Sequence, residues 1–322
     1  MKKIVVVVFL MLAMGISYAQ TAPELVKKAQ EKAGKKDYKG AVALLDKAIA
    51  INPNVPSYYF ERAICMFNSG AMEEAKTEAD KIPALFPDSI GVHLRTGIFF
   101  YDTRDFDHAI EVYDGIFNTF PTMPDSMRIG ILNNRGSSKH SMNDAAGAKE
   151  DYDIAYAIDS MNISIMINLA GVYDDLGKPE ESVRLLLKVI KLQPNNNSTY
   201  NNLGFIYNNM GKYKEAIDIF NKSIDLIKKN KDYESQVVLG FTYSNRGHAK
   251  YKLGDNKGAL KDFELSIELA PSNSYVFKNR ALVYIAMNKN KEACLDLYRA
   301  ISLGFADMYG NEVEKLINAY CR

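Results

Sequence analysis

Prolines recur in this chain at a fixed interval. Pro87 follows Pro53 by 34 residues, and Pro121 follows Pro87 by the same step. A 34-residue period is the length of one pair of helices with its turns. A single pair cannot bury its apolar face alone, so such pairs stack on their neighbours and leave a long groove. The period therefore predicts an all-α chain whose functional surface is a groove rather than an enclosed pocket.

Two positions of the repeat carry only small side chains. If the proline is numbered position 32, position 8 is Gly or Ala and position 20 is Ala or Ser in all eight repeats. Position 8 is Ala29, Ala63, Gly97, Gly136, Ala170, Gly204, Gly247 and Ala281. Position 20 is Ala41, Ala75, Ala109, Ala148, Ser182, Ala216, Ala259 and Ala293. Larger side chains there would push the two helices apart, so we expect a close crossing.

Position 24 carries a large side chain in seven of the eight repeats. It is Leu45, Tyr113, Tyr152, Leu186, Phe220, Phe263 and Leu297, with Ala79 as the exception. We interpret these large residues as the ones that join each repeat to the next.

The full pattern resembles the tetratricopeptide repeat family over nearly the whole chain. The best matches are YNNLGFIYNNMGKYKEAIDIFNKSI, which begins at Tyr200, and YSNRGHAKYKLGDNKGALKDFELSIELAP, which begins at Tyr243. One departure is His93 at position 4, where we expect the third repeat to pack less tightly. The resemblance implies a right-handed superhelical solenoid of about eight helix pairs with a C-terminal capping helix.

The expected organisation follows from this register. Residues 1–19 are a signal peptide, and residues 20–322 are the solenoid. Its repeats start near residues 22, 56, 90, 129, 163, 197, 240 and 274, and its cap covers 305–322. Spacers at 124–128 and 231–239 interrupt the period, and either one extends a helix or bends the superhelix. We interpret them as joints within one solenoid, since the pattern resumes on both sides.

The N-terminus has the features of an export signal. Lys2 and Lys3 precede an apolar run at residues 4–14, and Ser17-Tyr18-Ala19 supplies small residues for cleavage after Ala19. The run is too short for a normal membrane span, which disfavours the alternative of an uncleaved anchor. We therefore expect a periplasmic or otherwise exported protein that is soluble after cleavage and is not an integral membrane protein.

The three cysteines have two different expectations. Cys65 lies among apolar neighbours on the first helix of the second repeat and should be a buried free thiol. Cys294 lies on the second helix of the last repeat, and Cys321 lies on the expected cap. In an exported protein we predict that these two form a disulfide that fastens the cap, the alternative being two unpaired buried thiols.

A row of asparagines is the main candidate site. In the resembled family the groove is lined by positions 2, 5, 6, 9, 12 and 13 of each first helix. Position 6 is Asn134, Asn168, Asn202, Asn245 and Asn279 in five consecutive repeats, and the groove around it includes Asn201, Phe205, Asn209, His248, Tyr251 and Lys278. Amides both donate and accept hydrogen bonds, so a row of them suits the backbone of an extended peptide. The alternative is that asparagine is common at this position in the family whether or not a ligand binds.

The first three repeats differ at the same positions. Phe60, Ile64, Phe67, Ile98 and Tyr101 make this stretch apolar. Exposed apolar patches usually mark contacts, so we expect a second partner site or a docking face for a loop.

Enzymatic signatures are absent from the sequence. It has no P-loop, no G-x-S-x-G, no H-E-x-x-H and no paired-cysteine metal spacing, so we expect no catalytic residues, metal or cofactor. A net charge of +1 disfavours nucleic acid as a partner. Our hypothesis is a non-enzymatic scaffold or adaptor in the cell envelope that holds an extended segment of another envelope protein. The alternative is a periplasmic binding protein for a glycan or peptidoglycan fragment, suggested by the Asn and Tyr content of repeats 5–8.

Overall fold

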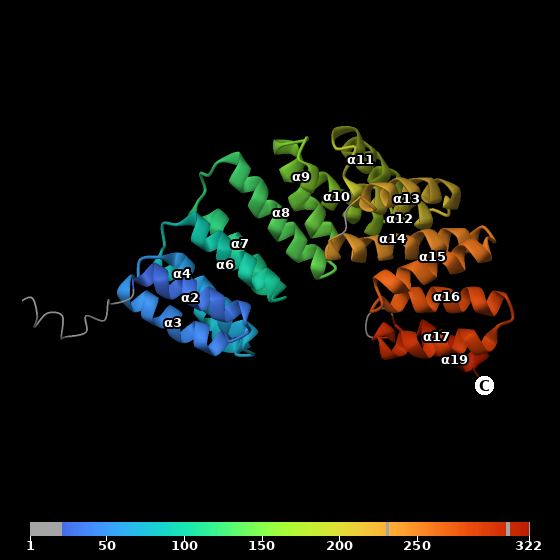
Figure 1. The fold of residues 1–322 in the computed structure, drawn as a ribbon. Helices are drawn as coiled ribbons and strands as arrows, with labels where there is room; N and C mark the ends of the chain where they lie inside the picture. The colour runs from blue at the N-terminus through green and yellow to red at the C-terminus, as the bar shows by residue number, and fades with distance from the viewer. Residues whose placement is uncertain (1–20, 230–231, 307–309, 322) are drawn as a thin grey trace, which may run out of the picture. The chain divides into compact units, whose positions relative to one another are not determined.

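The chain is all-α in its described part. The computed structural model describes residues 21–229, 232–306 and 310–321. Within these ranges it contains 17 helices and no strands, as predicted (Figure 1). The expected signal peptide at residues 1–19 lies outside the described residues.

The helices fall into two compact units, Met1–Asn143 and Asp144–Arg322. The division lies between the two helices of the fourth expected repeat and at neither spacer. Unit 1 contains α2 (Ala22–Gly34), α3 (Tyr38–Ile51), α4 (Pro56–Asn68), α5 (Met72–Leu85), α6 (Ile90–Asp102), α7 (Phe106–Thr119) and α8 (Asp125–Ser141). Unit 2 contains α9 (Ala145–Ile158), α10 (Ile163–Asp175), α11 (Pro179–Leu192), α12 (Asn197–Asn209), α13 (Tyr213–Ile227), α14 (Tyr233–Lys252), α15 (Asn256–Leu269), α16 (Ser274–Ala286), α17 (Asn290–Ser302) and α19 (Glu312–Tyr320).

A left-handed residue marks the turn inside every repeat. Position 15 has a positive φ in all eight: Lys36, Gly70, Arg104, Asn143, Gly177, Gly211, Gly254 and Asn288. Glycine adopts this conformation without steric penalty, whereas other L-residues are disfavoured by about 1–2 kcal/mol. Lys36 and Arg104, with φ values of 63° and 60°, therefore carry local strain.

Glycine at position 8 sets the approach of the two helices in a pair. A Cβ on Gly204 would lie 2.5 Å from Cε1 of Phe220, and one on Gly247 would lie 2.7 Å from Cε1 of Phe263. Glycine at position 8 accompanies an aromatic residue at position 24 in four repeats, whereas alanine accompanies Leu or Ala in the other four. The large residue at position 24 therefore also fills the space inside its own pair.

In three repeats, position 4 ties the first helix to the preceding proline. The hydroxyl of Tyr59 donates to the carbonyl of Pro53 at 3.0 Å, and Tyr200 makes the same bond to the carbonyl six residues before it. His93 places Nε2 3.2 Å from the carbonyl of Pro87 and packs edge-on against Phe120. The histidine thus takes over the tyrosine contact. His93 is only partly buried, whereas position 4 is buried in the other seven repeats, which agrees with the looser packing expected there.

The two spacers lengthen helices. The other six first helices have 13 residues each, whereas α8 has 17 and α14 has 20. Residues 125–128 and 233–239 continue directly into these helices. Of the two expected alternatives, the spacers therefore extend helices.

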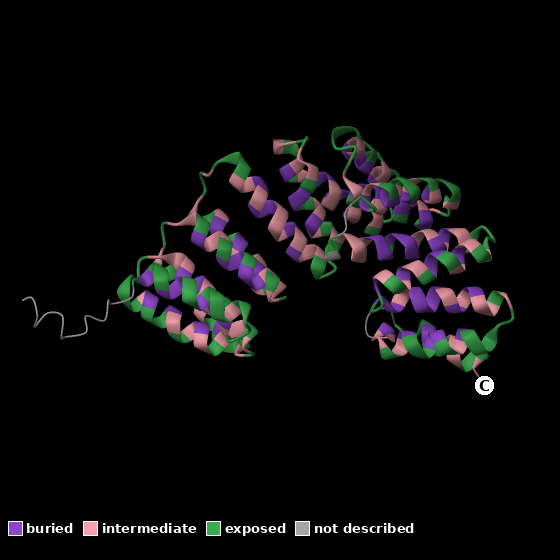
Figure 2. Cartoon of the chain, in the orientation of Figure 1, coloured by how far each residue is buried: buried purple, intermediate pink, exposed green. Residues whose placement is uncertain are grey.

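The C-terminal segment closes the core of unit 2. Phe305 and Val313 are fully buried in a cluster with residues of α15, α16 and α17. Cys294 on α17 and Cys321 form the predicted disulfide, with a Cα–Cα distance of 5.6 Å. Cys65 is a buried free thiol, as expected. Figure 2 shows the buried residues along the facing sides of the helices in each unit.

Candidate functional site

Three of the predicted asparagines form a row in unit 2. Asn168, Asn202 and Asn245 occupy position 6 of α10, α12 and α14, and each is partly exposed. We call these three residues the asparagine face. Asn134 is also partly exposed, on α8 of unit 1.

The row ends before the last repeat. Asn279 is only 1% exposed and Lys278 only 7%. The Lys278 ammonium pairs with the carboxylate of Glu312 at 3.0 Å, and Tyr275 stacks on Phe305, so the C-terminal segment packs against this part of α16. The expectation that Asn279 and Lys278 are open to a ligand is therefore wrong.

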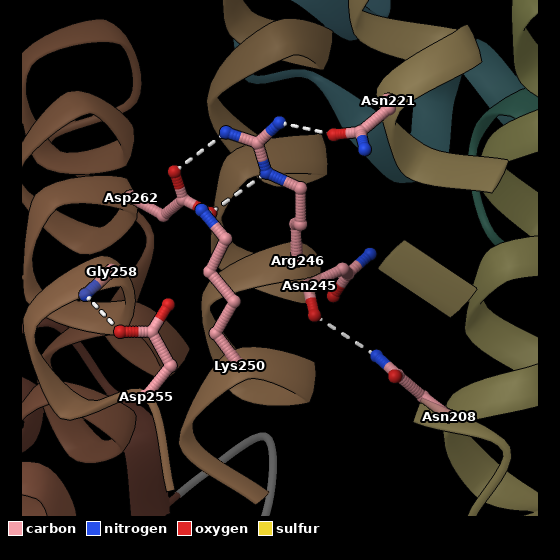
Figure 3. Close-up of polar contacts among 8 residues, drawn as sticks. All are labelled: Asn208, Asn221, Asn245, Arg246, Lys250, Asp255, Gly258 and Asp262. Carbon is pink, nitrogen blue, oxygen red and sulfur yellow. Dashed lines mark hydrogen bonds and ion pairs between the residues drawn. The ribbon is translucent and has the colours of Figure 1, made fainter. Parts of the chain in front are cut away.

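Side-chain amides connect the neighbouring first helices. Asn209 on α12 donates to Asp174 on α10 at 3.1 Å, and Asn208 donates to the backbone carbonyl of Asn245 on α14 at 2.9 Å (Figure 3). These bonds show that α10, α12 and α14 lie side by side in that order. Phe205, another predicted site residue, is 46% exposed, and Asn201 is partly exposed.

The charged groups on this surface are perturbed by burial. Burial raises the pKa of Asp174, Asp175 adds to the rise, and the bond from Asn209 opposes it. Burial, together with the positive charges of Lys252 and Lys278, lowers the pKa of His248 to about 4. His248 is therefore a neutral imidazole at pH 7, beside the partly buried Tyr251 and the exposed Lys252.

A buried ionic cluster supports the asparagine face from inside the repeat. Arg246 on α14 donates twice to Asp262 on α15, at 2.7 and 2.8 Å, and once to Asn221 at 2.6 Å. Lys250 pairs with the same carboxylate at 2.8 Å, and Asp262 is only 1% exposed (Figure 3). One carboxylate is thus shared by two cations, and these contacts hold α14 against α15.

The same pair recurs, and the sequence reasoning missed it. Arg280 donates twice to Asp296 at 2.7 Å in the last repeat, and Arg62 pairs with Glu78 in the second. All three place an arginine at position 7 and an acid at position 23. That spacing was the signal that could have predicted the contact.

Unit 1 carries an apolar hollow at the predicted place. Phe60, Ile64 and Phe67 of α4 and Ile98 of α6 line a cavity of about 430 Å³. A second hollow of about 270 Å³ shares Ile64 and reaches Leu45, Ala29, Ala33 and Cys65. Tyr101, the fifth residue expected here, does not line either hollow and packs edge-on against Phe106.

Comparison with protein-family models identifies the family of this chain. Three models described as tetratricopeptide repeat match residues 33–98, 163–196 and 196–272, which together exceed half of the sequence. The chain belongs to the tetratricopeptide repeat family.

Solved structures share the fold of this tetratricopeptide repeat protein. Yeast Tom70 superposes with a TM-score of 0.65 at 14% identity, covering 96% of this chain and 66% of that chain. The APC/C hetero-tetramer Cut9–Hcn1 gives 0.62 at 18%, covering 94% and 56%. A tetratricopeptide repeat protein from Parabacteroides merdae gives 0.53 at 15%, covering 94% and 99%. At these identities the similarity establishes the fold alone.

One curated relative matches a short part of this tetratricopeptide repeat protein. The Protein STIP1 homolog of Dictyostelium discoideum is 38% identical over 61 residues, which is 19% of this chain. The match spans only 11% of that relative's length.

In the described part of this tetratricopeptide repeat protein, no group of three or more His, Cys, Asp or Glu side chains is placed to hold a metal ion. None of the helices in the same part of the chain has the length and apolar character needed to cross a bilayer.

Proposed function

We propose that this protein is a non-enzymatic adaptor of the cell envelope that binds an extended peptide segment of another envelope protein on the asparagine face. The fold supports a protein–protein interaction scaffold in general terms, since tetratricopeptide repeats present extended binding surfaces rather than reactive pockets. The location and the mode of binding are the proposed parts.

The asparagine face carries the proposal. Three partly exposed amides recur at one position of three adjacent helices, which hydrogen bonds between those helices align. An extended peptide offers backbone N–H and C=O groups at regular intervals, and an amide side chain can bond either kind. Each such bond contributes only about 1 kcal/mol net, so several must act together.

The N-terminal sequence pattern supports the envelope location. The basic start, the short apolar run and the small residues Ser17 and Ala19 have the order of a cleavable signal. N-terminal sequencing of the mature protein would show Gln20 as the first residue, and an uncut Met1 in that protein would contradict the proposal.

Affinity capture tests the binding mode. Envelope extract is passed over the wild-type protein and over Asn168→Ala/Asn202→Ala/Asn245→Ala. Captured proteins are identified, and overlapping peptides from them are titrated by fluorescence anisotropy. We expect peptides that bind the wild type and lose at least tenfold in affinity with the triple variant. A control variant, Asn195→Ala/Asn290→Ala, removes two amides near turns instead.

Equal capture by the wild type and the triple variant would move the interface away from the asparagine face. A rise in melting temperature with peptidoglycan fragments, without any peptide binding, would favour the glycan alternative instead.

A further inference from the structure

Asp174 and Lys252 place opposite charges beside the two ends of the asparagine face, on α10 and on α14. Asp174 lies near the end of α10, and Lys252 is the last residue of α14. They occupy positions 12 and 13 of their repeats, and Asn209 at position 13 of α12 lies between them in helix order. The row therefore runs from negative through neutral to positive alongside the asparagine face.

Neither charge is neutralised within the described part of the chain. Asp174 accepts a hydrogen bond from the neutral Asn209, and no cation pairs with it among the described residues. Lys252 contacts the ring of Tyr251 at 5.9 Å, and the described residues provide no carboxylate partner for it. By contrast, Lys250, two residues before Lys252, is paired with Asp262.

The surroundings make both groups receptive to an opposite charge. Burial raises the pKa of Asp174, and its neighbour Asp175 adds a second negative charge. A cation beside Asp174 would favour its charged form and oppose the effect of burial. At the other end, burial lowers the pKa of His248, and the positive charges of Lys252 and Lys278 add to the fall. Lys278 is paired with Glu312, so Lys252 carries the positive charge that has no carboxylate partner among the described residues. An anion there would be stabilised.

We propose that unit 2 binds its peptide in one fixed direction, with a basic side chain of the peptide at Asp174 and an acidic side chain at Lys252. This inference rests on the proposed function and specifies its ligand. Adjacent helices lie about 8–10 Å apart, so the two charges are separated by about 16–20 Å across two intervals. An extended chain rises about 3.3 Å per residue, so the basic and acidic side chains stand about five or six residues apart.

Charge exchange on the full chain tests the direction. A random 12-residue peptide display library is selected on the immobilised wild type and on Asp174→Lys/Lys252→Asp, which keeps the net charge. Asp218→Lys/Lys261→Asp serves as the matched control, because it exchanges two exposed charges on the second helices α13 and α15.

The wild type should enrich peptides with one order of basic and acidic residues at a spacing of five or six. The exchanged variant should enrich the opposite order, and the control should behave as the wild type. A selected peptide, resynthesised with its two charges interchanged, should bind the wild type roughly 2- to 30-fold more weakly, as expected for two exposed ion pairs.

Two outcomes overturn the inference: enrichment without a charge order, or the same order from both the wild type and the exchanged variant. A third selection on Asn202→Ala/Asn245→Ala separates this failure from that of the proposed function. If enriched peptides lose binding to that variant but show no charge order, the adaptor proposal stands and the direction fails. If no peptide depends on the asparagine face, both fail.

Discussion

The close contact between Gly204 and Phe220 yields the sharpest prediction of stability. Gly204→Ala places a methyl carbon 2.5 Å from a ring carbon of Phe220. Carbon atoms pack at about 3.5–4.0 Å, so the fully buried ring must withdraw by about 1 Å. Overpacking of this kind destabilises by about 1–3 kcal/mol, whereas alanine improves helix propensity by about 1 kcal/mol. We expect a net loss of up to about 2 kcal/mol in the free energy of unfolding.

A second substitution should reverse most of this loss. Phe220→Leu alone leaves a cavity and should destabilise by about 1–2 kcal/mol. Gly204→Ala/Phe220→Leu reproduces the pairing of Ala170 with Leu186 in the preceding repeat. We therefore expect the double variant to lose about 1–3 kcal/mol less than the sum of the single losses.

The assay is urea unfolding followed by circular dichroism, with hydrogen exchange of α12 and α13 measured in parallel. Exchange is needed because stacked repeats can open one segment at a time. Gly171→Ala is the matched control, because no atom lies within 4 Å of its added Cβ, and it should stabilise by about 1 kcal/mol. Stabilisation by Gly204→Ala, or additive losses in the double variant, would refute the reasoning.

Three more predictions concern charge and backbone strain. Asp262→Ala should destabilise by about 3 kcal/mol in urea unfolding, because it leaves Arg246 and Lys250 largely buried without their carboxylate. Arg104→Gly should raise the free energy of unfolding by about 1 kcal/mol, since it removes a Cβ from a residue with φ 60°. The unfolded chain protonates His248 near pH 6.5 and the folded protein near 4, so His248→Gln should remove up to about 3 kcal/mol of stability loss as pH falls from 6.5 to 4.

Each of these has a result that would contradict it. Equal losses from Asp262→Ala and from Asp46→Ala, whose carboxylate is 53% exposed, would show that burial does not strengthen the pair. An equal gain from Arg104→Ala would attribute the effect to the lost charge rather than to the backbone. An imidazole of His248 that titrates near pH 6.5 by NMR would remove the basis of the pH prediction.

The helix pairs were predictable because the distance between the two helices of a pair depends on the size of the residues where they cross. Small residues at positions 8 and 20 recur eight times, and each marks a close helix crossing. The disulfide between Cys294 and Cys321 was predicted from the expectation of export and from the placement of Cys294 on the last repeat and Cys321 on the cap. The two spacers remained ambiguous, because the period shows where the pattern stops but not what the added residues do.

Burial of Asn279 was not predictable from the repeat. The segment that packs against it includes Phe305 and Glu312, which lie beyond the last repeat and follow no period. Position 6 therefore has the same residue in five repeats but a different environment in the last one. The ionic pairs were missed for a different reason. Their signal is a correlation between positions 7 and 23, which the residues at any single position do not show.

The lengths of α8 and α14 bear on how this chain tolerates insertion. Relative to the 13-residue first helices, they add four and seven residues. At 3.6 residues per turn these are about 1.1 and 1.9 turns, so the added residues return to nearly the same helix face, within about 40°. Two extra residues would instead rotate the upstream part by about 200° and turn its polar side inward. The first helices can thus be extended in near-whole turns, which makes the start of α14 a suitable place to graft a further recognition segment without disturbing the repeat behind it.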